Sequence, residues 1–514
     1  MKYSKIYRLF SLLLALCLLS GCTSSVPLRE EAAATLPPVE DKHAVPEGDT
    51  SREYAETVML YLPAVSNNQL ITVPERILIP SDRHPAEATI SKLLSFAGSE
   101  TARPFFPEAM LRLQEGKPAL EISGDTATVN LGSNAGMLSK HDLFTLRRAI
   151  TNTLVQWGDI RYVNVLVAGL EPGVDQAALT PAGSMQLTRN EDAPALWDSL
   201  STRSSLEGME YQRFSSVCTL YFPAGYGRGI LAEARTVSFP GQSYRQIASS
   251  LLQALSAGPQ VLHQSPVMPD LNSLLAEPPA LEEGDDGSYV ISLNFLDAAN
   301  DTFVKAGVPR SIMLAAITYT LTTFIPKLAG IKIRIGNEQI EGIVPGAIYE
   351  GAGQTILFSG SVLRRSDFSS FLLTDCTLYF AAGDSLSAVR RPVPYVSAYS
   401  RKYLIEQLAL GPQVFDSVQG TSPVFPEQTG SADILGVDKE GDTALINFSE
   451  GLFAAAKSLS PQKERLFVYS LVNTLCDTRA IRSVRIYVNG AQPESFAGSV
   501  WLPGEFLKNP EIIR

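Results

Sequence analysis

The residues of this chain that could bind a metal or act as nucleophiles are few. Of its 514 residues, four are histidines and five are cysteines. A metal site needs Cys, His or carboxylate ligands that converge at short, characteristic spacings. The sequence predicts no metal site and no cofactor, because no such spacing occurs. The histidines occupy unrelated places: His43, His84, His141 and His263.

Acidic residues gather in one short run, Glu282, Glu283, Asp285 and Asp286. One interpretation is a loose cation site. The other is a solvated hairpin turn, which we favour because the run lacks the loop pattern of a calcium-binding hand.

The cysteines indicate packing rather than redox chemistry. Two lie in the N-terminal leader, and the odd number that remains does not suggest a disulfide framework. Two of the remaining cysteines hold the same place in similar strands, where a third strand has Val58. We therefore predict a small, buried apolar position there, and burial of the last cysteine too. The five are Cys17 and Cys22 in the leader, then Cys218, Cys376 and Cys476.

An arginine and an asparagine recur at matching places in three similar stretches of chain. The arginine could contact a partner or a carboxylate, or it could lie on the wet face of its strand beside a helix acid. The asparagine ends a strand and precedes a helix, so we expect its side-chain oxygen to cap that helix, with a ligand contact as the alternative. These residues are Arg76, Arg235 and Arg391, and Asn130, Asn294 and Asn447.

Catalytic arrangements do not recur in the three stretches. No Ser/His/Asp set, phosphate-binding glycine loop or paired acid motif appears in more than one of them. The sequence therefore predicts no catalytic residues and no enzyme. The alternative hypothesis is an envelope hydrolase.

The three stretches belong to one long repeat. Val217–Phe222 recurs as Asp375–Phe380 and, more weakly, as Thr57–Leu62. The tyrosines of these strands are 160 (221 − 61) and 158 (379 − 221) residues apart. A period this long indicates tandem domains rather than a solenoid. We define them as module 1 (51–190), module 2 (212–365) and module 3 (371–505), with the polar residues 191–211 as an expected linker.

Each module has the same expected order of elements, ββαββαβ. A strand hairpin leads into an amphipathic helix, a proline turn such as Pro104–Pro107, a second hairpin, a longer helix and a closing strand. A Gly-Ser-apolar phrase then forms an edge segment or a linker. The fold class is α+β, with two helices on a mixed sheet in each module. The first helix of module 2 has its apolar residues at Tyr244, Ile247, Leu251, Leu252 and Leu255, and the expected C-terminal glycines are Gly98, Gly258 and Gly411.

The N-terminus has the form of a lipoprotein leader. Basic residues precede the apolar run Leu9–Leu19, which is too short to span a bilayer permanently. Leu19–Cys22 resembles the bacterial lipobox. That resemblance implies a signal peptide over 1–21, cleavage before Cys22 and acylation of its thiol by chains such as palmitate. The alternative is an ordinary secretory signal that contains a cysteine.

The expected location follows from the leader and from the charge. Acylation would anchor the protein on the outer face of the cell membrane of a Gram-positive type envelope. Residues 22–50 predict a disordered tether. A net charge of −11 gives no general basic surface for nucleic acid, so membrane contact is expected through the lipid alone.

Nearly the whole chain after the tether resembles the GerMN domain, the sporulation and spore-germination module of Gram-positive bacteria. Module 3 matches best and module 1 least. Family members typically carry one or two copies, so three is a departure. The matching features are the T-L-Y-F strand, the helix that ends in Gly-Pro, Asn447-Phe448-Ser449, the L-V-N-T-L of Leu471–Leu475, and the V-x-I-Y-V-N-G of Val484–Gly490.

The resemblance implies a membrane-anchored, non-catalytic scaffold that acts in sporulation or spore germination. Its expected partners are other proteins of the envelope or of a sporulation membrane complex. The alternative is a lipoprotein that binds a cell-wall or lipid-linked ligand or regulates a sensor, as in the similar LpqB branch.

Overall fold

The computed structural model describes residues 53–67, 69–116, 118–175, 180–205, 212–224, 226–260, 267–284, 287–345 and 354–514. The predicted signal peptide, the lipidation site Cys22 and the tether lie outside the described residues. So do His43, His263, Asp285 and Asp286.

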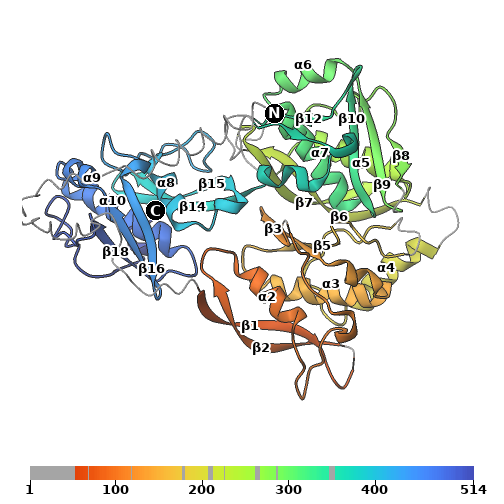
Figure 1. The fold of residues 1–514 in the computed structure, drawn as a ribbon, viewed down its shortest axis with the longest axis horizontal. Coiled ribbons are helices and arrows are strands. Elements are labelled where there is room, and N and C mark those ends of the chain that lie inside the picture. Colours follow the sequence, from red (N-terminus) through yellow and green to blue (C-terminus); the bar gives the residue numbers. More distant parts are fainter. Residues whose placement is uncertain are drawn as a thin grey trace, which may run out of the picture. The chain divides into compact units, whose positions relative to one another are not determined.

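Module 1 has the predicted order of elements (Figure 1). The first two strands form an antiparallel hairpin, and the central strand β4 pairs antiparallel with β3 and parallel with β5. The module therefore has a mixed three-stranded sheet and a separate two-stranded hairpin. Its elements are β1 (Glu53–Pro63), β2 (Leu70–Pro80), α2 (Pro85–Leu94), β3 (Leu120–Ser123), β4 (Thr126–Leu131), α3 (Lys140–Leu154) and β5 (Tyr162–Val167), with the 3-10 turns η1 (Pro107–Ala109) and η2 (Ser133–Met137).

Module 2 repeats this order and adds a short helix, α6, after the second hairpin. Its sheet again combines antiparallel and parallel pairs around the central strand β9. Its elements are β6 (Phe214–Ala224), β7 (Gly229–Phe239), α5 (Tyr244–Ser256), β8 (Ala280–Glu283), β9 (Tyr289–Phe295), α6 (Ala298–Lys305), α7 (Arg310–Phe324), β10 (Leu328–Ile335), β11 (Glu338–Gln339), β12 (Gly342–Ile343) and β13 (Ile356–Leu357).

Module 3 follows module 2 closely, with α9 as the added short helix. The sheet order is β16-β17-β18-β19, and β17 pairs parallel with β18. Its elements are β14 (Leu373–Ala382), β15 (Ser385–Pro394), α8 (Arg401–Ala409), β16 (Ile434–Glu440), β17 (Thr443–Phe448), α9 (Glu450–Ala456), α10 (Pro461–Cys476), β18 (Ser483–Val488) and β19 (Phe506–Leu507). The α+β fold class is confirmed, and the sequence missed the short helices α6 and α9.

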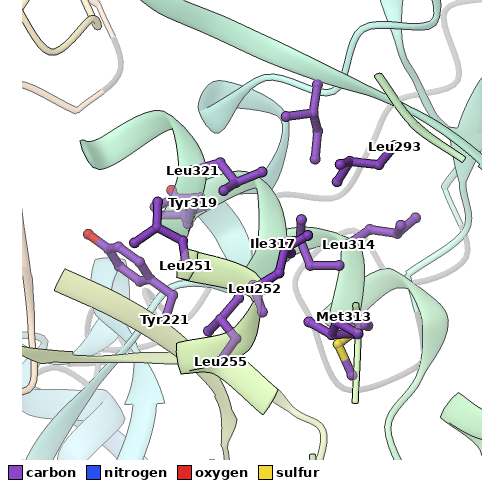
Figure 2. Close-up of a cluster of buried hydrophobic side chains, with 14 of the residues drawn as sticks. Tyr221, Leu251, Leu252, Leu255, Leu293, Met313, Leu314, Ile317, Tyr319 and Leu321 are labelled. Atoms are coloured by element: carbon purple, nitrogen blue, oxygen red, sulfur yellow. The ribbon is translucent and has the colours of Figure 1, made fainter. Parts of the chain in front are cut away.

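Each module has its own hydrophobic core among the described residues. In module 2 the five predicted apolar residues of α5 are all buried. Figure 2 shows three of them, Leu251, Leu252 and Leu255, beside α7 residues that include Met313 and Ile317. Burying a leucine or methionine side chain stabilises a fold by about 1.5–3 kcal/mol, so these cores hold the helices on their strands.

The expected C-terminal glycine is confirmed for the first helix of modules 2 and 3. Gly258 and Gly411 both have a φ of 71° and directly follow the helix cap, a conformation that glycine adopts without steric cost. The expectation is wrong for Gly98. Helix α2 already ends at Leu94 with Ser95 as its cap, so Gly98 lies in the following loop.

An additional segment pairs with the closing strand of every module. Antiparallel pairs join Val163 to Met185, Ile331 to Leu363, and Val484 to Phe506. In module 1 the pairing residue is the apolar residue of the Gly-Ser phrase, and in module 2 it is the residue after that phrase, so the edge-segment interpretation is confirmed there. In module 3 the pairing begins later in the chain, at β19.

The expected linker after module 1 is wrong over most of its length. Helix α4 (Ala193–Ser205) forms there, and its Leu200 is buried in a small cluster with Phe144, Val174 and Met185. Apolar residues at Leu196 and Leu200, one helical turn apart, were the signal in this polar stretch.

Candidate functional site

The recurring arginines of modules 2 and 3 are internal. Arg391 is fully buried, and its Nε and Nη2 donate to the two carboxylate oxygens of Asp416 at 2.8 and 2.7 Å. Its Nη1 donates to the Gln407 carbonyl and its Nη2 to the Gly411 carbonyl, both at 2.7 Å. The guanidinium therefore fixes the C-terminal end of α8 to strand β15 from inside the module.

Arg235 makes the equivalent contacts in module 2. Its Nε donates to Glu233 at 2.6 Å and its Nη2 to the Gly258 carbonyl at 2.6 Å. The guanidinium carbons of Arg235 and Arg391 lie 4.9 and 5.2 Å from the ring centres of Phe222 and Phe380, which hold equivalent places in the opening strands. The predicted carboxylate contact is confirmed for both arginines, and the wet-face interpretation is wrong. Because both guanidinium groups bind internal carboxylates and carbonyls, neither is open to a partner.

Arg76 does not belong to this set. Cys218 pairs with Arg235 and Cys376 with Arg391, whereas Val58 pairs with Glu75. Since neighbouring residues of a strand face opposite sides, a shift of one residue turns Arg76 outward, where it is exposed. Its use as a partner contact stays a prediction.

Glu75, the structural counterpart of the two arginines, is also joined to the first helix of its module. Its carboxylate lies 3.1 Å from Nζ of Lys92, in the last turn of α2. The contact between the second strand and the first helix therefore has reversed charges in module 1, with the acid on the strand and the base on the helix.

The helix-capping prediction is wrong for the three asparagines. The next helices have Ser139, Asp297 and Ser449 at their N-caps. Oδ1 of Asn130 instead accepts from the Gly169 N–H at 2.8 Å, and Oδ1 of Asn447 from the Gly490 N–H at 2.9 Å. Asn294 donates to Glu277.

These contacts give Asn130 and Asn447 a different structural role. Each lies on a central strand and accepts from the tight turn that follows the neighbouring closing strand. The turn residues have positive φ values, 50° and 82° at Ala168 and Gly169, and 46° and 78° at Asn489 and Gly490. The asparagine thus holds a strained turn against the sheet.

A recurring threonine that was not predicted from the sequence contacts the opening strand of each module. The backbone N–H of the opening-strand tyrosine donates to a threonine hydroxyl of the longer helix in all three modules. The pairs are Tyr61 with Thr153 at 3.0 Å, Tyr221 with Thr320 at 3.0 Å, and Tyr379 with Thr474 at 3.2 Å. The signal was a Thr-Leu pair at the same place in every helix, Thr153-Leu154, Thr320-Leu321 and Thr474-Leu475.

The residue before this threonine also has a shared role in modules 1 and 3. The side-chain amide of Asn152 donates to the Thr188 carbonyl and accepts from the Thr188 N–H, at 2.9 Å in both cases. Asn473 does the same with Asn509, at 3.0 and 2.8 Å. Both asparagines therefore fasten the edge segment that follows their module. Module 2 has Tyr319 at this place.

Tyr319 belongs to a buried polar cluster that joins modules 1 and 2. Its hydroxyl donates to Glu121 of β3 at 3.0 Å, and Nε of Arg365 donates to the same carboxylate at 2.9 Å. The guanidinium lies 4.0 Å from the Tyr319 ring centre and its Nη2 donates to the Tyr221 hydroxyl at 3.0 Å. Burial is the largest single influence and opposes the charged form of Arg365, but the Glu121 carboxylate together with Tyr221 and Tyr319 raises the pKa of the guanidinium.

The three described cysteines are free, and none is an activated thiol. Cys218 and Cys376 are buried as predicted, whereas Cys476, the last residue of α10, is half-buried. Burial raises the pKa of Cys376 to about 12 and of Cys476 to about 11, and that of Cys218 well above its usual value. No group of three or more His, Cys, Asp or Glu residues that could hold a metal occurs in the described part of the chain.

Within the acidic run of module 2, the structure shows two side-chain contacts of Glu282. Glu282 lies on β8, where its carboxylate is 2.5 Å from Nζ of Lys332 and accepts from the Ser292 hydroxyl at 2.6 Å. These partners lower the pKa of Glu282, with the Lys332 hydrogen bond as the largest cause. The contacts belong to a strand surface, which agrees with the solvated hairpin that we favour.

A cleft of about 700 Å³ lies in module 1 and beside the helix that follows it. Its walls come from the end of β1, the proline turn at Pro104–Pro107, the N-terminal half of α3 and the start of α4. Aromatic residues Phe105, Phe106, Phe144 and Trp197 line it together with Arg148. The proline turn and α4 therefore build this space together, and in the described part of the chain no α-helix lies between modules 2 and 3.

The comparisons with known proteins bear on module 3 most directly. Residues 377–494 match a family named Germane and described as "Sporulation and spore germination". Module 3 is therefore similar to the Germane domain. This match lies where the GerMN resemblance is strongest in the sequence, and it supports a role in sporulation or spore germination. For modules 1 and 2, the likeness to the Germane domain rests on their element order and on the recurring Tyr-Thr contact.

Solved structures of GerMN domains and of a putative lipoprotein are similar to this chain. The tandem GerMN domains of the sporulation protein GerM from Bacillus subtilis are 16% identical, covering 58% of this chain and 99% of that one, with a TM-score of 0.21. The first GerMN domain of GerM is 24% identical over 26% of this chain and 98% of its own, with a TM-score of 0.22. A putative lipoprotein from Clostridium perfringens is 24% identical over 26% and 88%, with a TM-score of 0.19. No curated protein sequence matches this chain.

Proposed function

We propose that this chain is a membrane-anchored, non-catalytic scaffold that acts in sporulation or spore germination by binding other envelope proteins. The observation that carries the proposal is the Germane match over residues 377–494. The proposed anchor is the acylated Cys22. No helix in the described part of the chain is long and apolar enough to cross a membrane.

The contacts that the recurring polar residues make support a scaffold rather than an enzyme. Arg235, Arg391, Asn130 and Asn447 all bind groups of their own module. The residues that the repeat preserves therefore maintain the fold. A repeat kept for catalysis would be expected to preserve polar groups that converge on an open site.

Exposed apolar side chains in module 3 and just after it are the proposed binding surface. Trp501 and Leu507 are each 65% exposed, and Val414 and Leu410, just after α8, are 65% and 59% exposed. A tryptophan is a frequent energetic anchor of protein interfaces. With three modules in one chain, several weak contacts would combine into a stable attachment.

The test is deletion of the gene in its own organism, followed by counts of heat-resistant spores and of germination. We expect a drop in one of these, restored by the wild-type gene. The Trp501→Ala gene should restore less, while the control Val65→Ala, at an exposed apolar side chain of module 1, should restore fully. Unchanged spore yield and germination after deletion would refute the proposal.

The anchor has a separate test. Replacing Cys22 by Ser should release the protein from the membrane fraction of the cells. If Cys22→Ser protein stays in that fraction, the lipid-anchor part of the proposal is wrong, whatever the outcome for sporulation.

A further inference from the structure

The cleft of module 1 contains a buried positive charge without a matching negative one. Arg148 of α3 is only 6% exposed and lines the cleft. Its Nη2 makes two hydrogen bonds, to the Arg189 carbonyl at 3.4 Å and to Oδ1 of Asn190 at 3.2 Å. Both acceptors are uncharged, and Nε is buried without a partner among the described residues.

Burying a guanidinium in this way destabilises the fold unless an anion pairs with it. A buried charge is stable only when it is paired and hydrogen-bonded, and an arginine offers five N–H groups in a flat fork that matches a carboxylate. Nη1 of Arg148 donates to no described residue, so this side of the fork is available to an anion in the cleft. By contrast, its neighbour Arg147 is paired with Glu171 at 2.8 Å.

The outer part of the cleft has the opposite charge. Glu108 and Asp198 are exposed and Asp142 is half-buried, and all three line the cleft. The other guanidinium of the lining, Arg103, is exposed and donates to the Ala64 carbonyl at 3.3 Å. A ligand that enters this space therefore meets a basic floor and a predominantly acidic opening.

The walls between floor and opening are apolar and flat. Trp197 lies 5.2 Å from the Phe144 ring and 5.0 Å from the His141 ring, measured between ring centres. Phe106 is held at a φ of 38°, a left-handed conformation that side-chain-bearing residues rarely adopt. Strain of this kind is often kept at binding sites, and the volume of about 700 Å³ suits a small molecule.

The features of the cleft are specific to module 1. When the recurring threonines are aligned, Arg148 corresponds to Ala315 in module 2 and to Tyr469 in module 3. Helix α4, which provides Trp197, follows module 1 alone in the described chain. The module that has diverged most from the Germane pattern is thus the one with a cleft of its own.

We propose that this cleft binds a zwitterionic amino acid or short peptide. Its carboxylate contacts Arg148, its apolar side chain packs against Trp197 and the phenylalanines, and its ammonium group faces Glu108, Asp142 and Asp198. This site is independent of the scaffold function proposed above, since it uses no residue of the Germane match.

Titration of the chain from residue 23 onward with L-alanyl-L-phenylalanine tests the proposal. Trp197 reports binding through its fluorescence, and Trp197→Phe identifies the part of the signal that comes from the cleft. We expect saturable binding of the dipeptide and at least roughly tenfold weaker binding of its C-terminal amide, since a hydrogen bond to a charged group contributes about 1.5–3 kcal/mol. N-acetylation of the dipeptide should weaken binding less, because the acids lie nearer to solvent.

Variants separate the two ends of the ligand. Arg148→Gln should weaken dipeptide binding by about 10- to 100-fold, while Arg189→Gln, at a side chain that is 75% exposed, should leave it unchanged. Asp198→Asn, an exposed change that the fold should tolerate, should weaken binding of the dipeptide but not of its N-acetyl form. Calorimetric titration of the same variants provides a readout that does not depend on Trp197.

Three outcomes would overturn the proposal. One is equal binding of the dipeptide and its amide. Another is binding of phenyl phosphate but not of the dipeptide, which would make the cleft a phosphate site. The last is the absence of any saturable binding in a chain that is folded by circular dichroism.

Discussion

At the scale of single residues, module 3 depends on an ion pair that has no contact with water. Both Arg391 and Asp416 have side chains that are 0% exposed. Removing one partner of a buried pair leaves an uncompensated charge and typically costs about 3–5 kcal/mol. We therefore expect Arg391→Met to lower the free energy of unfolding of module 3 by this amount, measured by calorimetry or urea denaturation.

The control for this substitution is an arginine in a surface pair. Arg112 lies 2.9 Å from Glu115, and the two side chains are 64% and 77% exposed. Exposed pairs contribute about 0–1 kcal/mol, so Arg112→Met should change stability little. An equal effect of the two substitutions would contradict the importance of burial at Arg391.

The buried thiols lead to a second prediction at this scale. The thiolate is the reactive form of cysteine, and a pKa of about 12 at Cys376 leaves about one thiolate in ten thousand at pH 8. The folded chain from residue 53 onward should therefore react slowly with a disulfide reagent at pH 8. Half-buried Cys476 should be labelled first and Cys218 last, as determined by peptide mass spectrometry. Rapid labelling of all three thiols under native conditions would show that these strands open readily.

At the scale of elements, the joint between opening strand and longer helix is common to the three modules. The Tyr379 N–H donates to the hydroxyl of Thr474, and Thr474 is fully buried. Thr474→Val keeps the shape of the side chain but leaves this N–H without an acceptor, which typically costs about 1–3 kcal/mol. We expect a lower calorimetric midpoint for module 3.

Thr474→Ser keeps the hydroxyl and loses only a methyl group, so it is the matched control. Its midpoint should lie between those of the wild type and Thr474→Val. If valine is tolerated as well as serine, the hydrogen bond does not hold this helix on its strand.

Elements with a clear period could be predicted from the sequence, and their side-chain environments could not. The apolar spacing of α5 identified its buried face, and Gly258 and Gly411 marked two helix ends. Arg76 was misplaced because a repeat comparison cannot detect a register difference of one residue, which reverses the face of a strand. Asn130 and Asn447 were misassigned because the N–H groups that donate to them lie about 40 residues further on, across a parallel strand pair.

The cleft of module 1 could also not be predicted from the sequence. Its floor and walls come from separate places between Pro63 and Asp198, and only the fold brings them together. Phe105, Phe106 and Trp197 were visible as aromatic residues in a turn and a polar stretch. Neither stretch had a period to show which way these side chains face.

At the scale of the whole molecule, modules 1 and 2 share buried polar contacts. Asn164 of β5 donates to the Thr219 hydroxyl of β6 at 2.8 Å. The Ser184 hydroxyl belongs to the same network, because it forms hydrogen bonds with both of these side chains. The Ser123 hydroxyl donates to the Leu373 carbonyl at 2.6 Å, which extends the contacts to the start of module 3. Buried networks of this kind specify one arrangement when every member is satisfied.

These contacts predict that modules 1 and 2 unfold together. Arg365→Met would leave the buried Glu121 carboxylate without its guanidinium and should split a shared calorimetric transition into two. Arg364→Met is the control, because that guanidinium bonds to carbonyls of its own module, at Ser359 and Val362. Two separate transitions in the wild-type chain, or a single one in Arg365→Met, would show that the Glu121 cluster does not couple the modules. Coupling matters for a tethered scaffold, because rigidly joined modules present their surfaces at a fixed spacing, whereas independent modules bind as a flexible string.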